Sequence, residues 1–132
     1  MNHEQIFEGV RDCIAATLGN GANSIRMESR IIDDLGADSL DLLDLVFQME
    51  QKFKISISPR GIEQRAKARL GGAPLDIDGV YTPAALAELR NALPEVPPGE
   101  LADGLTASQL PRRFRVATMC NLVARLLEEK GE

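Results

Sequence analysis

The placement of proline divides this chain of 132 residues into three stretches. All seven prolines lie between residues 59 and 111. Because proline breaks a helix interior, long uninterrupted helices are confined to the flanking stretches. Both flanks carry apolar residues at helical spacing. We therefore predict a single domain, residues 1–132, with a helical core formed by 1–58 and about 116–132 and an insertion, 59–115, between them.

Three helices are predicted in the core. The first starts after Asn2, which suits an N-cap with Gln5 three positions on, and it stops at Gly19. The second opens at Asp38, and the last begins near Thr118 as its N-cap. Their inner faces should carry Ile6, Val10, Cys13, Ile14 and Leu18; Leu42, Leu45, Val46, Met49 and Phe53; and Met119, Leu122, Val123, Leu126 and Leu127.

The insertion is also predicted to be mostly helical. Ser58-Pro59 and Thr82-Pro83 each pair an N-cap residue with proline at the first helical position. Gly71-Gly72 should end the first of these helices, and Pro94 the second. The stretch APLDIDGVY is extended in character but too short to predict a sheet. The fold class is therefore all-α, and the insertion is a folded addition rather than a disordered linker.

Composition limits the partners and the location of the protein. A formal net charge of −5 argues against nucleic acid or anionic lipid as the main partner, since both need a basic surface. It favours a basic protein surface instead. No apolar run is long enough to span a membrane, and the start MNHEQIFEGV lacks the order of a signal peptide. We expect a cytoplasmic monomer without stable membrane insertion.

The stretch DLGADSLDLLDLVFQMEQKF, residues 34–53, places Ser39 at the start of the second helix. A nucleophilic serine needs a nearby base, usually histidine, and the only histidine is His3, beside the terminus. Neither a GxSxG elbow nor an SxxK pattern surrounds Ser39. Asp38 and Asp41 would lie in the first helical turn, where the helix dipole stabilises carboxylates. No catalytic residue is predicted, so the chain is not expected to be an enzyme.

No metal site or disulfide is predicted either. Asp76-Ile77-Asp78-Gly79 matches only part of a calcium loop, because the earlier acidic position and the distal glutamate are absent. A solvated turn explains it better. Cys13 and Cys120 lie far apart, each within a helical pattern, which favours two buried thiols over a disulfide.

Ser39 is better placed to be modified than to catalyse. With Asp38 at the N-cap, Ser39 is the first helical residue and should face outward. A phosphodiester on its oxygen would lie near free backbone amides and the positive helix end. Gly36 allows the preceding loop to turn tightly. The alternative is that Asp38 and Ser39 merely cap a helix, as such pairs commonly do.

The residues Asp34–Asp41, DLGADSLD, followed by LLDLVFQMEQKFKISI, closely resemble the attachment region of acyl carrier proteins. The DxGxDSLD pattern of that family is matched position by position. The resemblance covers residues 1–58 and again about 116–132, where VATMCNLVARLLEE is similar to the family's last helix. It implies an antiparallel helical bundle. Residues 59–115 depart from the family, which has a brief segment with a small third helix at this point.

The resemblance implies that Ser39 bears 4'-phosphopantetheine, which a phosphopantetheinyl transferase takes from coenzyme A with the help of magnesium. Asp38 would help to hold that transient magnesium ion, and Leu40 would contact the transferase and later partners. The thiol of the arm would carry acyl chains as thioesters between acyl-transferring and chain-building enzymes of fatty acid or lipid biosynthesis. Carriers with a long insertion after the second helix are similar to those dedicated to unusual chains, including the very long chains of lipid A.

The second helix also carries a second apolar face. Leu40, Leu43 and Phe47 follow i, i+3, i+7 spacing away from the inner face. An exposed apolar stripe with acidic neighbours would serve as a partner-docking surface. The acidic neighbours are Asp41, Asp44 and Glu50. Alternatively, Leu43 and Phe47 pack beneath the insertion.

Other functions remain open from the residues alone. The chain could be a carrier of a polyketide or non-ribosomal peptide synthase, or a non-catalytic interaction module that has lost its modification. The intact Asp38-Ser39-Leu40 triplet argues against the latter. The insertion could cover a cavity for a longer acyl chain or add a recognition surface for one partner.

Overall fold

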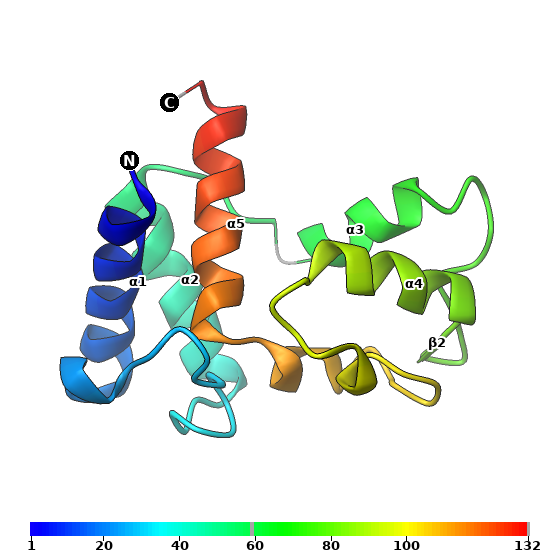
Figure 1. The fold of residues 1–132 in the computed structure, drawn as a ribbon, viewed down its shortest axis with the longest axis horizontal. Coiled ribbons are helices and arrows are strands. Elements are labelled where there is room, and N and C mark those ends of the chain that lie inside the picture. Colours follow the sequence, from blue (N-terminus) through cyan, green and yellow to red (C-terminus); the bar gives the residue numbers. More distant parts are fainter. Residues whose placement is uncertain (59, 132) are drawn as a thin grey trace. The chain divides into compact units, whose positions relative to one another are not determined.

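The computed structural model describes residues 1–58 and 60–131, which form two compact units (Figure 1). The core unit comprises Met1–Ile57 and Phe114–Glu132, and the inserted unit comprises Ser58–Arg113. Helices dominate the described chain, so the predicted all-α class is confirmed, with a single small hairpin added. None of the described helices is both long and apolar enough to cross a membrane.

The core unit contains three helices, α1 (His3–Leu18), α2 (Ser39–Phe53) and α5 (Val116–Glu129). α1 packs against both α2 and α5 (Figure 1). Asn2 and Gln5 form the predicted capping box: the Asn2 side chain accepts from the Gln5 N–H at 2.8 Å, and the Asn2 N–H donates to Gln5 Oε1 at 3.0 Å. Gly19 ends α1 in the left-handed conformation that glycine adopts readily. A single turn of 3₁₀ helix, Ala22–Ser24, follows.

The predicted start of α5 was wrong. The helix begins at Val116, so Thr118 occupies its third position, where the hydroxyl accepts from the Arg115 N–H at 2.9 Å. The reason is a backbone pairing that local sequence does not reveal. The Val116 N–H donates to the Ser29 carbonyl at 2.9 Å and the Ile31 N–H to the Phe114 carbonyl at 3.1 Å. This pairing holds the chain extended up to Arg115, and the helix starts immediately after it.

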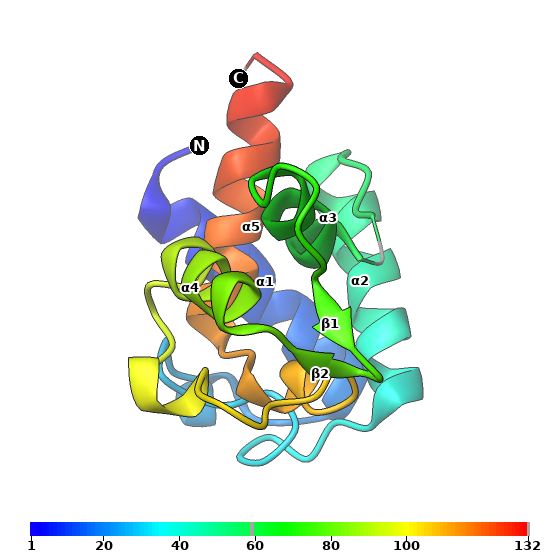
Figure 2. The same ribbon diagram turned by 90° about the vertical axis from the view of Figure 1, so that its right-hand side faces the viewer.

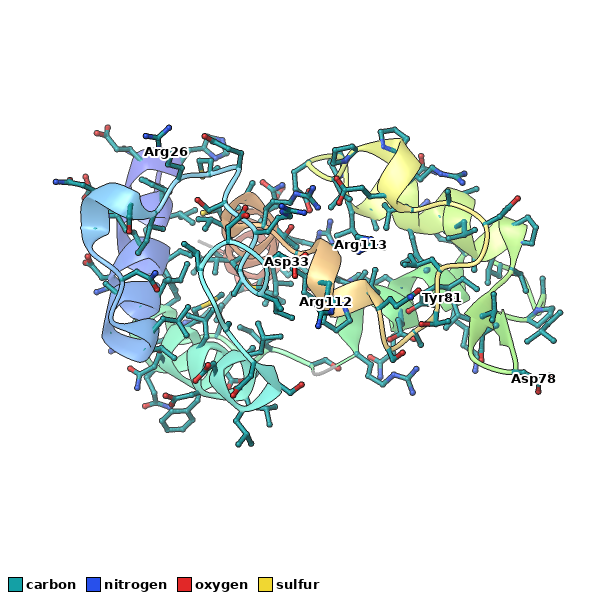
Figure 3. The ribbon with its side chains drawn as sticks, turned by 90° about the horizontal axis from the view of Figure 1, so that it is seen from below. Arg26, Asp33, Asp78, Tyr81, Arg112 and Arg113 are labelled. Carbon is teal, nitrogen blue, oxygen red and sulfur yellow. The ribbon has the colours of Figure 1, made fainter. Side chains whose placement is uncertain are left out.

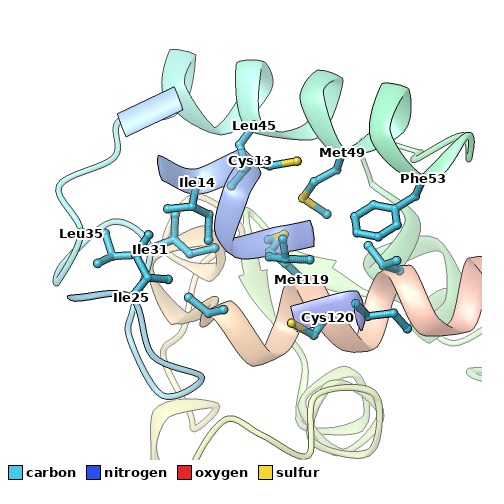
Figure 4. Close-up of a cluster of buried hydrophobic side chains, with 14 of the residues drawn as sticks. Cys13, Ile14, Ile25, Ile31, Leu35, Leu45, Met49, Phe53, Met119 and Cys120 are labelled. Carbon is cyan, nitrogen blue, oxygen red and sulfur yellow. The ribbon is translucent and has the colours of Figure 1, made fainter. Parts of the chain in front are cut away.

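The hydrophobic interior of the core unit is built from its three helices and the loop between α1 and α2 (Figure 4). Of the predicted inner faces, ten positions are buried, whereas Leu18, Leu42, Val46, Leu122 and Leu126 are only partly so. Both cysteines are buried and free, as predicted. Burial raises the pKa of Cys120 to about 11, which keeps this thiol protonated and unreactive. The buried set is Ile6, Val10, Cys13, Ile14, Ile25, Ile31, Leu35, Ala37, Leu45, Met49, Phe53, Val116, Met119, Cys120, Val123 and Leu127.

The inserted unit contains α3 (Gly61–Ala68), strands β1 (Asp76–Ile77) and β2 (Val80–Tyr81), and α4 (Pro83–Ala92), followed by 3₁₀ turns at Pro98–Glu100 and Leu110–Arg113 (Figure 2). α3 packs against α4, and the strands pair antiparallel. The unit encloses a core of its own. That core comprises Ala66, Tyr81, Ala85, Leu86, Leu89, Leu93, Val96, Leu101, Leu105 and Leu110.

The predicted helix ends in the inserted unit were partly right. Thr82 caps α4 as expected, with its hydroxyl accepting from the Ala85 N–H at 3.1 Å. α3 is shorter than predicted at both ends. It begins at Gly61 with Arg60, and not Ser58, as its N-cap, and after Ala68 the chain tightens into turns in which the Leu70 N–H donates to the Lys67 carbonyl at 3.1 Å. The predicted proline at the start of this helix, Pro59, lies outside the described residues.

Candidate functional site

Ser39 is the first residue of α2, and its side chain is exposed. The helix start is fixed by two carboxylates. Asp38 Oδ1 accepts from the Asp41 N–H at 2.8 Å, and Asp41 Oδ2 accepts from the Asp38 N–H at 3.0 Å. This reciprocal capping box occupies both carboxylates with backbone amides and leaves the Ser39 hydroxyl exposed to solvent.

The loop before Ser39 is anchored to the hydrophobic core by buried side chains. Leu35 and Ala37 are buried beside Ile31, and Figure 4 shows Leu35 and Ile31 lying together with Ile25. Gly36, with φ of 82°, makes the turn between them in the left-handed region. The Ala37 N–H then donates to the Ile31 carbonyl at 3.1 Å. Ser39 therefore stands at the end of an anchored loop.

An ion pair closes the same loop at its outer edge. The Asp34 carboxylate accepts from the Arg30 backbone N–H at 2.8 Å and from the Arg30 guanidinium at 3.3 Å. The backbone hydrogen bond, followed by the side-chain one, holds the pKa of Asp34 below its ordinary value. Asp33 lies 3.7 Å from the same guanidinium.

The N–H groups of Ser39 and Leu40 meet no acceptor in the described part of the chain. Two unpaired amides at the positive end of a helix suit a phosphate group carried on the neighbouring oxygen. The single histidine of the chain, His3, lies at the start of α1 and not at this helix start. Within the described residues no group of three His, Cys, Asp or Glu side chains could hold a metal ion. The geometry thus fits a modified serine.

The second apolar face of α2 is open. Leu40, Leu43 and Phe47 are 75%, 64% and 55% exposed, so no part of the core unit covers them. Asp44 is exposed on the same helix. The structure therefore places three apolar side chains and an acid together beside Ser39.

The other two predicted docking acids also have structural tasks. Asp41 is half-buried as part of the capping box. Glu50 is half-buried as well, and its Oε2 accepts from the Ile57 N–H at 2.8 Å, which ties down the chain after α2. The sequence did not indicate this bond, because Glu50 and Ile57 are separated by a break in the helix.

A cleft of about 600 Å³ lies at the other end of α2, where it approaches the end of α5. Its sides include Ile55 and Leu126, and Lys130 Nζ donates to the Lys54 carbonyl at 2.7 Å beside it. No sequence signal predicted this cleft, because it joins residues at the end of α2 to residues at the end of α5, which are far apart in the sequence. Its lining is Glu50, Gln51, Lys54, Ile55, Ser56, Leu126, Glu129 and Lys130.

Comparison with known proteins locates the similarity around this site. The sequence pattern of one family, described as a phosphopantetheine attachment site, matches residues 8–66, a range that includes Ser39. The chain is 48% identical to an acyl carrier protein of Clostridium acetobutylicum over 59 residues, which are 45% of this chain and 77% of that protein.

Two further relatives give the same result. An acyl carrier protein of Campylobacter curvus is 46% identical over 52 residues, covering 39% of this chain and 68% of the relative. An acyl carrier protein of Thermotoga maritima is 40% identical over 63 residues, which are 48% of this chain and 78% of that protein. In each case the similarity accounts for less than half of the present chain, and the family pattern ends at residue 66, within the inserted unit.

Proposed function

The chain belongs to the acyl carrier protein family, and we propose that Ser39 is the residue that bears its 4'-phosphopantetheine. The observation that carries this assignment is the exposed Ser39 hydroxyl at the first position of α2, fixed by the reciprocal bonds of Asp38 and Asp41. Members of this family are carriers and not enzymes. The 4'-phosphopantetheine group supplies a thiol that holds acyl chains as thioesters.

The residues around Ser39 have separate tasks in this proposal. The Ser39 hydroxyl attacks the coenzyme A phosphate that bears pantetheine, so that the Ser39 Oγ–P bond forms while the P–O bond to the leaving adenosine 3',5'-bisphosphate breaks. The transferase takes up the proton of the hydroxyl, because this helix start contains no histidine. Asp38 uses Oδ1 to cap α2, which leaves Oδ2 for a magnesium ion brought with the transferase. The free N–H groups of Ser39 and Leu40 then face the phosphate that remains on Ser39.

The partners in this proposal are the transferase and the enzymes that load, extend and unload the acyl chain. Leu40, Leu43 and Phe47 provide apolar contact, and Asp41, Asp44 and Glu50 attract a basic partner surface. We place the protein in the cytoplasm, as a monomer, in fatty acid or lipid biosynthesis, with very long acyl chains such as those of lipid A as one substrate class. The long insertion supports a specialised carrier over a general one.

Mass spectrometry of the intact protein tests the assignment of Ser39. The chain is incubated with a phosphopantetheinyl transferase, magnesium and coenzyme A, beside Ser39→Ala and Ser56→Ala. Ser56 is a matched control because it is also exposed and belongs to the core unit. We expect the wild type and Ser56→Ala to gain one phosphopantetheine group and Ser39→Ala to gain none. A wild type that stays unmodified, or a modified Ser39→Ala, contradicts the proposal.

A further inference from the structure

The loop before α2 begins where it pairs with the segment that enters α5. That segment, Phe114–Val116, follows the inserted unit in the chain and is here called the return segment. The Phe114 carbonyl accepts from the Ile31 N–H at 3.1 Å, and the Val116 N–H donates to the Ser29 carbonyl at 2.9 Å. These two hydrogen bonds hold the two segments antiparallel and in a fixed register.

Ile31 connects this pairing with the backbone that carries Ser39. While its N–H is bound to the return segment, its carbonyl accepts from the Ala37 N–H at 3.1 Å. The Ile31 side chain is 0% exposed and packs in the core, where close packing resists displacement. Ala37 is also buried, and Asp38, the N-cap of α2, follows it directly. Two hydrogen bonds through one buried residue therefore join the return segment to the start of α2.

A further set of bonds makes the same loop compact. The Arg30 carbonyl accepts from the N–H groups of Asp34 and Leu35, both at 3.0 Å, and the Asp34 carboxylate accepts from the Arg30 N–H at 2.8 Å. Asp33 lies on this loop as well, 3.7 Å from the Arg30 guanidinium (Figure 3). The pKa of Asp34 is lowered chiefly by the Arg30 backbone N–H, and the charge of Arg115 in the return segment adds a smaller lowering. We therefore expect the loop to move as one piece with the return segment.

We propose that the return segment positions Ser39 for phosphopantetheine transfer, with Ile31 as the positioning residue that joins the two. This inference rests on the proposed function of Ser39. The transferase must bring the Ser39 oxygen into line with one P–O bond of coenzyme A, and a small displacement of an attacking atom slows such a reaction steeply. The capping box orders the first turn of α2 itself, whereas the pairing with the return segment fixes where the backbone enters that turn.

Val116→Pro tests this role, because it removes one hydrogen bond of the pairing. Val116 is the first residue of α5, where proline is well tolerated. The preceding residue, Arg115, is already extended, with φ of −109° and ψ of 171°, as a residue before proline prefers to be. The variant therefore loses the N–H that binds the Ser29 carbonyl while α5 still forms. Val116→Ala is the matched control, since it keeps the N–H and removes more of the buried side chain.

We expect Val116→Pro to lower kcat for phosphopantetheine transfer about tenfold, with the KM for the carrier chain unchanged because the apolar face of α2 is intact. Val116→Ala should keep the wild-type kcat. Amide hydrogen exchange provides a second measurement, in which the Ala37 N–H should exchange faster in Val116→Pro than in Val116→Ala. Both are measured where circular dichroism shows the variants folded. A merely structural role would lower the Tm of both variants without these differences.

Hydrogen exchange of the unmodified wild type provides a test that needs no variant. Since the loop and the return segment should move as one piece, the N–H groups of Ile31, Ala37 and Val116 should open with the same free energy and the same dependence on urea. This measurement carries the test should Val116→Pro fail to fold. An Ala37 N–H that opens independently of the other two overturns the proposal.

Loading of the wild type is measured first, so that two kinds of failure are told apart. A wild type that accepts no phosphopantetheine removes the proposed function and the positioning role with it. A wild type that loads normally, beside a Val116→Pro variant with the same kcat, removes the positioning role alone. A raised KM with unchanged kcat would make the return segment part of the transferase contact, and an equal loss of kcat in Val116→Ala would make packing the cause. Either result also overturns the proposal.

Discussion

Ser39 is presented by the residues that surround it. Asp38 and Asp41 use their carboxylates on each other's backbone amides, which orders the first turn of α2 without covering the hydroxyl. The loop before Ser39 is anchored by Leu35 and Ala37, whose side chains are buried in the core. An exposed side chain on an ordered backbone is accessible to an incoming transferase and is held in one orientation.

Asp38 has two tasks in this account, and substitution can separate them. Asp38→Ala removes the cap and should cost about 1 kcal/mol of folding free energy. Asp38→Asn keeps a capping side chain, so stability should stay near that of the wild type, while the loss of charge slows magnesium-dependent modification. Urea unfolding and the rate of phosphopantetheine transfer measure the two effects.

Asn2→Ala is the control for Asp38, because Asn2 caps α1 in the same way. It should destabilise the protein by a similar amount and leave the modification rate unchanged. If Asp38→Asn were modified at the wild-type rate, the carboxylate would have no part in the transfer.

Asp34 should make the stability of the protein depend on acidity. Its pKa in the folded protein is lowered, chiefly by the Arg30 backbone N–H and next by the Arg30 side chain. A lowered pKa means that the stabilisation is present above the unfolded value of about 3.9 and is lost as the pH falls through the folded pKa. We expect the Tm of Asp34→Asn to fall less than the Tm of the wild type as the pH is lowered from above the unfolded pKa to below the folded pKa of Asp34.

Arg30→Lys distinguishes the two causes of the Asp34 shift. The variant keeps the backbone N–H, which is the larger cause, and so it should retain most of the wild-type acid dependence. An acid dependence lost equally in Arg30→Lys and Asp34→Asn would instead make the guanidinium the main cause.

At the scale of elements, α1 and α2 approach closely at Gly9. A Cβ at this position would lie 2.5 Å from the Phe53 ring. Gly9→Ala should therefore lower the free energy of unfolding by about 1–3 kcal/mol through overpacking. Gly21→Ala is the control, since nothing lies within 4 Å of its added Cβ and its φ of −66° suits alanine. Urea unfolding in which both variants matched the wild type would show that α2 shifts freely on α1.

The helix α2 has two apolar faces, one buried and one exposed. Leu45, Met49 and Phe53 are buried, whereas Leu43 and Phe47 are exposed. The predicted docking face is therefore available on the core unit. Glu50, which was predicted to flank it, holds the end of the helix through the Ile57 N–H.

At the scale of the whole molecule, the chain is divided between two cores. The apolar cluster of the core unit consists only of residues from Met1–Ile57 and Phe114–Glu132. Ser58–Arg113 buries a separate set, which includes Leu86, Leu89 and Leu101. Each unit thus has the interior that a folded domain requires.

We expect the core unit to fold and accept phosphopantetheine when residues 58–113 are replaced by a flexible Gly/Ser linker. Cooperative urea unfolding and a gain of one phosphopantetheine group are the measurements. If the inserted unit recognises a specialised partner, transfer of the acyl chain to that partner should be lost in the same chain, because the inserted unit is gone. A truncated chain that is unfolded would show that the insertion supports the core unit, and undiminished acyl transfer would remove its recognition role.

Local chemistry allowed much of this structure to be predicted. Caps such as Asn2, Asp38 and Thr82 depend on residues three positions away, and apolar periodicity marks the face that a helix buries. The exposed position of Ser39 and the burial of both cysteines followed from such patterns. The sequence alone therefore determined the helical class, the start of α2 and the candidate residue for modification.

Tertiary structure decided what depends on residues far apart in the chain. The pairing of Ser29–Ile31 with Phe114–Val116 moved the start of α5 away from Thr118. The separate core of the inserted unit and the bond from Ile57 to Glu50 have the same origin. Short-range patterns show which residues avoid water, but only the folded chain determines which partners bury them and which are left exposed.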